Sequence, residues 1–157
     1  MALEIERKFL VVNDRWRAAA GPGVTMWQGY LATSVTSSIR VRVSGDAAEL
    51  NIKESRPGLV REEFEYPIPL ADAEAMLAGL CESPPIEKTR YRIAGTDGLV
   101  WEVDVFSGAN AGLVIAEVEL DDPEQRFVRP DWLGDDVSND LRYYNVCLAT
   151  HPYRDWP

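Results

Sequence analysis

The residues of this chain that could do chemistry are carboxylates, arginines and lysines that recur two positions apart. Near the start of the chain Glu4, Glu6 and Lys8 alternate with Ile5 and the following residues, and residues two apart share one face of a β-strand. Carboxylates held close together bind hard divalent cations through oxygen, whereas arginine and lysine bind phosphoryl oxygens. A site that holds both kinds of group suits a metal-bound polyphosphate, because phosphoryl transfer depends mainly on positioning and on neutralising charge.

The same spacing recurs along the chain, and the sign of the charge changes from one segment to another. Arg40 and Arg42 form a cationic pair, whereas Glu117 and Glu119 form an anionic pair. The full set of charged faces holds eight bases and eight acids: Lys8, Arg40, Arg42, Lys53, Arg61, Lys88, Arg90 and Arg92, with Glu4, Glu6, Glu63, Glu65, Glu102, Asp104, Glu117 and Glu119. If these faces converge inside a barrel, they form a polar tunnel that is neutral before a metal binds.

An ordinary strand with one face in water also alternates between apolar and polar residues. A β-barrel interaction module with a charged outer face is therefore the alternative interpretation. Three features argue against it: the polar faces are almost purely ionisable, the two signs are segregated, and all three lysines of the chain lie on these faces. The two interpretations differ in where Arg40, Lys88 and Glu117 point, into a tunnel or into bulk solvent.

The elements that must position these residues are mainly strands. Period-two alternation predicts eight strands, over about 3–10, 26–31, 38–43, 49–54, 61–68, 87–93, 99–106 and 114–120. Helices are expected from Asn13 or Asp14 to Ala20, and over 72–81, 123–127 and 137–149. The predicted fold is mainly β (α+β): an eight-stranded antiparallel closed barrel, which has no free edges, with a few peripheral helices. A length of 157 residues predicts a single domain over 1–157.

Composition excludes several other classes of protein. The chain has 16 basic and 26 acidic residues and a net charge of −10, which argues against a general nucleic-acid binder. The chain has two cysteines, which are far apart, and one histidine. These numbers argue against a disulfide scaffold, a thiolate zinc site and a Ser-His-Asp triad. No apolar run approaches a membrane span, and the charged N-terminus is unlike a signal peptide. We therefore expect a cytoplasmic protein without a membrane partner.

The motifs also occur in an order that resembles a known family. The run Glu-Ile-Glu-Arg-Lys at 4–8 has the ExExK pattern of the CYTH superfamily, the triphosphate tunnel metalloenzymes. The matching blocks that follow are Gln-Gly-Tyr-Leu at 28–31, Arg40 and Arg42, Lys53, 61–65, 87–91, 102–106, 117–119 and 142–149. Together they cover nearly the whole chain, and they are most similar to the short, single-domain bacterial members.

The resemblance implies roles for individual residues. It implies a tunnel that binds triphosphate compounds with Mg²⁺ or Mn²⁺. The expected metal ligands are Glu4, Glu6, Glu117 and Glu119, supported by Glu63, Glu65 and Asp104. The expected phosphate ligands are Lys8, Arg40, Arg42, Lys53, Arg61, Lys88 and Arg90. Tyr30 is a candidate for orienting or deprotonating a water molecule, and Lys8 or Lys88 could hold that water instead.

The favoured function is metal-dependent hydrolysis of inorganic tripolyphosphate to pyrophosphate and phosphate. Thiamine triphosphate hydrolysis and class IV-type adenylyl cyclase activity are the alternatives of the same class, and both need a place for an organic group. A non-catalytic module that binds polyphosphate or nucleotides in the same tunnel is the alternative of another class. The expected partner is a small triphosphate, and a homodimer is allowed for.

Overall fold

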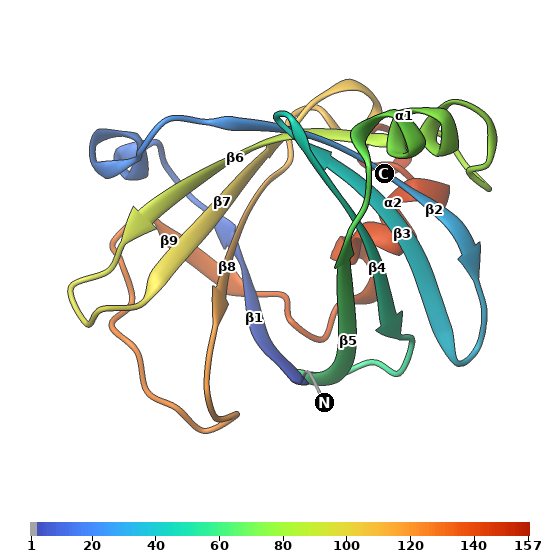
Figure 1. Cartoon of the computed structure of the whole chain (residues 1–157). Coiled ribbons are helices and arrows are strands. Elements are labelled where there is room, and N and C mark those ends of the chain that lie inside the picture. Colours follow the sequence, from blue (N-terminus) through green and yellow to red (C-terminus); the bar gives the residue numbers. More distant parts are fainter. Residues whose placement is uncertain (1–2) are drawn as a thin grey trace.

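The computed structural model describes residues 3–157 and has a closed antiparallel barrel at its centre (Figure 1). The eight predicted strands are confirmed: β1 (Leu3–Val11), β2 (Val24–Thr33), β3 (Ser37–Ser44), β4 (Ala47–Glu54), β5 (Val60–Pro67), β6 (Ile86–Ala94), β7 (Val100–Phe106) and β8 (Val114–Glu119). They pair in the order β5-β4-β3-β2-β6-β7-β8-β1, and pairing of β5 with β1 closes the barrel. Closure leaves few free edges, as the sequence predicted.

Strand β1 is held by three partners. One edge pairs with β8, where Glu6 lies opposite Glu119 and Lys8 lies opposite Glu117. The other edge pairs first with β5, where Glu4 lies opposite Arg61, and then with an additional strand, β9 (Leu133–Asp136). The sequence did not predict β9, because Leu-Gly-Asp-Asp is short and lacks alternation.

The apolar faces of the strands point outward and most are covered, although Phe64 and Tyr66 of β5 stay exposed, and the polar faces are left for the interior. Three apolar clusters form outside the barrel wall. One packs under Trp16 and Trp132, a second under Leu148, and the third under Leu77. The predicted alternation is therefore correct in phase, although the face that meets water in an ordinary strand here meets the tunnel.

The short helices were predicted with mixed success. Helix α1 (Leu70–Gly79) confirms the prediction over 72–81, and a 3₁₀ turn, η1 (Arg15–Ala19), stands for the first predicted helix. The prediction over 123–127 is wrong. Asp122 accepts hydrogen bonds from the backbone of Glu124 and Gln125, and the Gln125 side chain accepts one from Asp121 N. These local bonds compete with a helix.

The predicted helix over 137–149 is wrong in extent. The backbone NH of Val137 donates to the carbonyl of Lys8, and this bond ties the start of the segment to β1. A 3₁₀ turn, η3 (Leu141–Tyr143), follows, and α2 (Asn145–Thr150) comes after it. Tyr144, between them, is extended with φ −71° and ψ 136°. The helix is thus broken at one residue beside the barrel.

The remaining turns are η2 (Gly108–Asn110) and η4 (Tyr153–Asp155). None of the helices within residues 3–157 is both long enough and apolar enough to cross a membrane.

A charged tunnel as the candidate active site

The inward faces of the strands converge on a cavity of about 130 Å³ inside the barrel. Its lining includes these residues from the predicted set: Glu4, Glu6, Lys8, Tyr30, Arg40, Arg42, Lys53, Arg61, Glu63, Glu65, Arg90, Glu102, Glu117 and Glu119. Lys88 and Asp104 are buried in the wall behind this lining. Since Arg40, Lys88 and Glu117 are all buried, the alternative of a barrel with these charges on its outer face is wrong.

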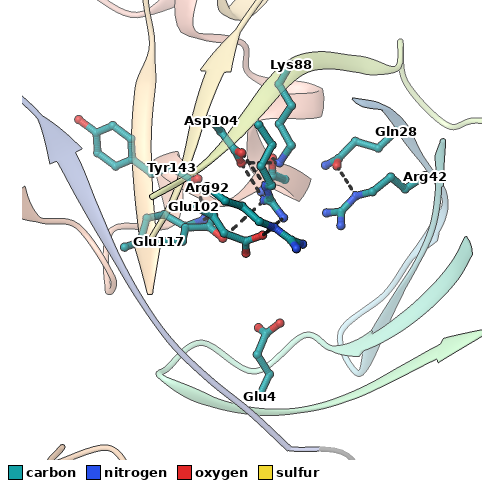
Figure 2. Close-up of polar contacts among 12 residues, drawn as sticks. Glu4, Gln28, Arg42, Lys88, Arg92, Glu102, Asp104, Glu117 and Tyr143 are labelled. Atoms are coloured by element: carbon teal, nitrogen blue, oxygen red, sulfur yellow. Dashed lines mark hydrogen bonds and ion pairs between the residues drawn. The ribbon is translucent and has the colours of Figure 1, made fainter. Parts of the chain in front are cut away.

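Asp104 on β7 is the centre of a buried ion-pair network. Its two carboxylate oxygens accept hydrogen bonds from Arg90 at 2.7 and 2.9 Å, and Lys88 Nζ lies 2.8 Å from Oδ2. Burial acts to raise the pKa of Asp104, but Lys88 and Arg90 hold that pKa well below its usual value. Asp104 therefore remains ionised and anchors two cations. Glu4 lies across the tunnel from this network (Figure 2).

Lys88 is buried close to Arg90 and Arg42, and the single carboxylate of Asp104 does not neutralise all of this positive charge. Burial lowers its pKa, Asp104 acts to raise it, and Arg90 and Arg42 lower it further, to about 7. The Lys88 ammonium also donates to Asn145 Oδ1 at 3.4 Å. A bound anion nearby would favour the charged form of Lys88, since opposite charges stabilise each other.

Two arginines of β3 continue the cationic wall. Arg42 Nε donates to the buried Gln28 Oε1 at 3.0 Å, and burial, followed by Arg40 and Arg90, lowers the pKa of Arg42 to about 10. Arg40 lies 4.0 Å from its paired carboxylate, Glu49. Its buried Nε finds no hydrogen-bond partner in the part of the chain that the structure describes. This wall therefore has hydrogen-bond donors left for an anion.

The opposite side of the tunnel is acidic. Lys53 Nζ bridges Glu4 at 2.7 Å and Glu63 at 3.1 Å. Burial acts to lower the pKa of Lys53, but Glu4 and Glu6 raise it above its ordinary value. Burial, and then the charge of Glu117 and Glu4, raise the pKa of Glu6 well above its ordinary value. This pKa shift shows that the acids have too little positive charge around them.

The acidic side fits a hard divalent cation in its donor chemistry. Carboxylate oxygens are the ligands that Mg²⁺ and Mn²⁺ prefer. Burial, and then repulsion from neighbouring carboxylates, raises the pKa of Glu6 and of Glu119, and a cation would relieve the repulsion. Within residues 3–157 no three carboxylates are already gathered closely enough to hold a metal ion. The Lys53 ammonium lies between Glu4 and Glu63, where it takes the place of a cation.

Lys8 and Glu117 join the two sides of the tunnel. The ammonium of Lys8 lies 3.6 Å from Glu117 and donates to the carbonyl of Tyr143 at 3.1 Å (Figure 2). Burial acts to raise the pKa of Glu117, but Lys8 and Arg90 lower it to about 2. Glu117 is therefore an ionised carboxylate at neutral pH.

Several lining residues were not predicted from the sequence. Asn51 lies on an inward face, where alternation with Lys53 could have indicated it, and Gln28, buried behind the lining, could have been indicated by alternation with Tyr30. Other lining residues missed from the sequence are Ser38, Tyr144, Asn145 and Val146, and the last three follow the break in the predicted helix. Conversely, Arg92 shares the inward phase but lies outside the cavity, with a side chain 73% exposed and paired with Glu102 at 3.4 Å.

Comparisons with known proteins agree with this geometry. The chain is 45% identical over 156 residues to an inorganic triphosphatase of Acetivibrio thermocellus, covering 99% of both chains. It is 40% identical over 149 residues to an inorganic triphosphatase of Nitrosomonas europaea, covering 93% of this chain and 96% of the relative. The crystal structure of the inorganic triphosphatase NE1496 superimposes with a TM-score of 0.66 at 36% identity, over 95% of each chain.

The model of the CYTH domain matches residues 2–153, which include every strand of the barrel and the broken C-terminal helix. The match covers nearly the whole chain, and the family resemblance seen in the sequence motifs is confirmed. This protein belongs to the CYTH domain family.

Proposed function

We propose that this protein hydrolyses inorganic tripolyphosphate to pyrophosphate and phosphate with the help of Mg²⁺ or Mn²⁺. The observation that carries the proposal is the cavity itself, which has a volume of about 130 Å³ and in which a cationic wall faces an acidic wall. Such a cavity fits a short polyanion and its counter-cation. The identity to two proteins named as inorganic triphosphatases supports the same substrate class.

The acidic wall is the proposed metal site. Glu4, Glu6, Glu117 and Glu119 are the proposed ligands, with Glu63 and Glu65 in support. When bound, the cation supplies Lewis-acid neutralisation of charge on the phosphoryl oxygens. We assign Asp104 to anchoring Lys88 and Arg90 instead, because both of its oxygens are already engaged by them.

The cationic wall is the proposed grip on the phosphates. The proposed phosphate ligands are Arg40, Arg42 and Arg90 of this wall, together with Lys8, Lys53 and Arg61 from the rest of the cavity lining. Arginine matches phosphoryl oxygens in pairs, and lysine acts as a compact charge. The buried Arg40 Nε, free of other partners among residues 3–157, supports a role in holding an anion.

In the proposed reaction a water oxygen attacks a terminal phosphorus. The bond from that phosphorus to the bridging oxygen breaks, pyrophosphate leaves, and the water loses a proton. Tyr30 and Lys8 line the cavity and are the candidates for orienting this water. Lys88 lies behind the lining, so we assign it to supporting the positive potential of the wall.

The test is phosphate release from tripolyphosphate with Mg²⁺ and, separately, with Mn²⁺. We expect turnover by the native chain and a loss of at least about a hundredfold in the Glu4→Gln/Glu6→Gln variant, because two metal ligands are removed. Arg56→Met is the matched surface control, since Arg56 is exposed and pairs only with Glu54 in the described chain. Phosphate release no higher than that of the double variant would contradict the proposal.

The same assay with thiamine triphosphate or ATP as the substrate, followed by identification of the products, separates the alternatives. Thiamine triphosphate hydrolysis yields thiamine diphosphate, and a cyclase yields a cyclic nucleotide and pyrophosphate. Neither is favoured by an observation, because the cavity lining is overwhelmingly polar and charged. Tight binding of tripolyphosphate without turnover under either metal would indicate a non-catalytic module. The single-domain organisation and a homodimer stay predictions for hydrodynamic measurements.

A further inference from the structure

Three consecutive residues beside the tunnel contact three of its cations. The Tyr143 carbonyl accepts a hydrogen bond from Lys8 Nζ at 3.1 Å, and Asn145 Oδ1 accepts one from Lys88 Nζ at 3.4 Å. The ring of Tyr144 lies 5.2 Å from Lys8 Nζ and 5.0 Å from the guanidinium carbon of Arg61, measured to the ring centroid. The extended backbone at Tyr144 makes these contacts compatible, because a continuous helix would satisfy the Tyr143 carbonyl internally.

The ring of Tyr144 is fixed in place. Tyr144 is 6% exposed, and its hydroxyl donates to the Ser138 carbonyl at 2.8 Å. The Ser138 hydroxyl in turn accepts from the backbone NH of Lys8 at 2.8 Å. The ring is therefore anchored to the strand that carries one of the cations it contacts.

The groups through which residues 143–145 meet these cations are a carbonyl, an aromatic face and an amide oxygen, whereas Lys8 and Lys88 also pair with Glu117 and Asp104 of the barrel. All three attract a cation and none carries a charge. Arg61 shows the consequence most clearly. It lines the cavity, yet across residues 3–157 no carboxylate lies within 4.0 Å of its guanidinium. Its charge is oriented by the ring and is not neutralised.

We propose that Tyr144 is a positioning residue that holds Arg61 and Lys8 toward the cavity without neutralising them. This inference rests on the proposed function, because the cations so held are part of the proposed phosphate grip. A carboxylate at the same place would hold the two side chains equally well but would cancel the charge that attracts a polyanion. The aromatic face supplies orientation and leaves the attraction to the substrate intact.

The first test is a pair of variants. Tyr144→Phe keeps the ring, and we expect KM for tripolyphosphate within about twofold of the native value. Tyr144→Met keeps much of the volume but removes the aromatic face, and we expect KM to rise about tenfold with kcat changed less than threefold. The matched control is Tyr153→Met, since Tyr153 packs against Trp156 outside the tunnel, and its KM should be unchanged.

A second test keeps the shape of the side chain constant. Tyr144 is replaced by phenylalanine and then by phenylalanines with one, two and three ring fluorines, which weaken the negative face of the ring stepwise. We expect KM to rise with each fluorine while the melting temperature stays level. In an Arg61→Met background the rise should be smaller, because one of the two cations is gone. This series tests the positioning role of Tyr144 even if the Tyr144→Met variant does not fold.

The outcomes separate this inference from the proposed function. Native turnover with a KM that is insensitive to fluorination would overturn the positioning role and leave the proposed function standing. If the native chain has no turnover, the proposed function fails, and calorimetric titration with tripolyphosphate in EDTA decides the role of Tyr144. In that titration we expect fluorination to weaken binding, and equal binding or no binding at all would overturn the inference.

Discussion

Arg40 is a buried cation with little compensation from the protein. It is 6% exposed, its paired carboxylate is 4.0 Å away, and its Nε has no partner within the described residues. Burying a charge without full pairing costs stability. A residue of this kind is better explained by what it binds than by what it contributes to folding.

We therefore expect Arg40→Met to weaken substrate binding and to spare the fold. KM for tripolyphosphate should rise by about 10- to 100-fold, the equivalent of about 1.5–3 kcal/mol for hydrogen bonds to a charged group. The free energy of unfolding, measured by urea denaturation, should be unchanged or higher, because an incompletely paired charge has been removed. A variant that unfolds easily but keeps a native KM would show that Arg40 has been misassigned.

The sequence predicted which residues face the tunnel but not how deep each one lies. Alternation places Lys88 and Arg90 on the same face, yet Lys88 is sealed behind the lining and Arg90 reaches the cavity. Arg92, two residues further on, reaches solvent. Depth depends on the tilt of each strand and on neighbouring side chains, and neither is encoded in the local pattern.

At the level of elements, Gly29 sets the distance between α1 and the barrel. It lies on β2 between the inward residues Gln28 and Tyr30, so its own Cα faces outward. A β-carbon built there would overlap Cys81 Sγ and lie 3.1 Å from Leu77 Cδ2. The absence of a side chain thus allows α1 to pack directly on the strand that carries Tyr30.

Gly29→Ala should therefore destabilise the protein by about 1–3 kcal/mol, the usual cost of overpacking. Cys81→Ala alone removes the overlapping sulfur, and the double variant Gly29→Ala/Cys81→Ala should recover part of the loss. Urea denaturation of all four proteins gives the coupling energy between the two sites. Additive losses would mean that Cys81, two residues after α1, does not press on Gly29.

The additional strand β9 is fastened to β1 by Asp136. This carboxylate pairs with Arg7 and accepts from Ser138 N at 2.8 Å. Burial acts to raise the pKa of Asp136, but these hydrogen bonds lower it below 3.8. Because the pKa is lower in the folded state, the stabilisation is complete above the unfolded value of about 3.9 and is lost as the pH falls through the folded value.

Asp136→Asn should lower the free energy of unfolding by about 1 kcal/mol at pH 7, a figure reduced for the partial exposure of the pair. The difference from the native protein should shrink toward zero as the pH approaches 3. Urea denaturation over this pH range measures it, with Asp135→Asn, an exposed neighbour, as the control. A difference that does not change with pH would exclude a role for the Asp136 charge.

Strands and helices differed in how well the sequence predicted them, for a physical reason. Most barrel strands have one charged and one apolar face, because one face lines the tunnel and the other packs against the apolar clusters, and this makes the period-two signal strong. After residue 120 the path of the chain is set by hydrogen bonds within the segment, such as that of Asp122, and by hydrogen bonds to β1, such as that of Ser138. Contacts of this kind depend on the finished barrel and leave no periodic trace in the sequence.

On the scale of the whole molecule, the interior is close to neutral although the protein is acidic. The tunnel and its wall hold seven bases, including Lys88, and eight acids, including Asp104. Most of the net charge of −10 therefore lies on the outer surface. The sequence count of eight bases included Arg92, which the structure leaves outside. A cation bound in the balanced interior would strengthen its attraction for a polyanion.

Metal and substrate should accordingly stabilise the protein together more than separately. Saturating ligand at about 100 times its Kd adds about 2.7 kcal/mol to the free energy of unfolding. We expect a modest rise in melting temperature with Mg²⁺, a small one with tripolyphosphate in EDTA, and a rise with both that exceeds the sum. The Glu4→Gln/Glu6→Gln variant should lose the excess, and thermal shifts that simply add would contradict coupling through the tunnel.

Strand β1 is the first strand of the barrel along the chain, whereas two of its three partners, β8 and β9, are the last two strands. The barrel cannot close until almost the whole chain is available, and such long-range pairing is the slow part of folding. The same closing step brings Glu6 opposite Glu119 and Lys8 opposite Glu117. The carboxylates thus meet only at the end of folding, and their mutual repulsion opposes the last pairing. We expect divalent cations to speed this final step of refolding, so that the ion proposed to act in the tunnel would also help the barrel to close.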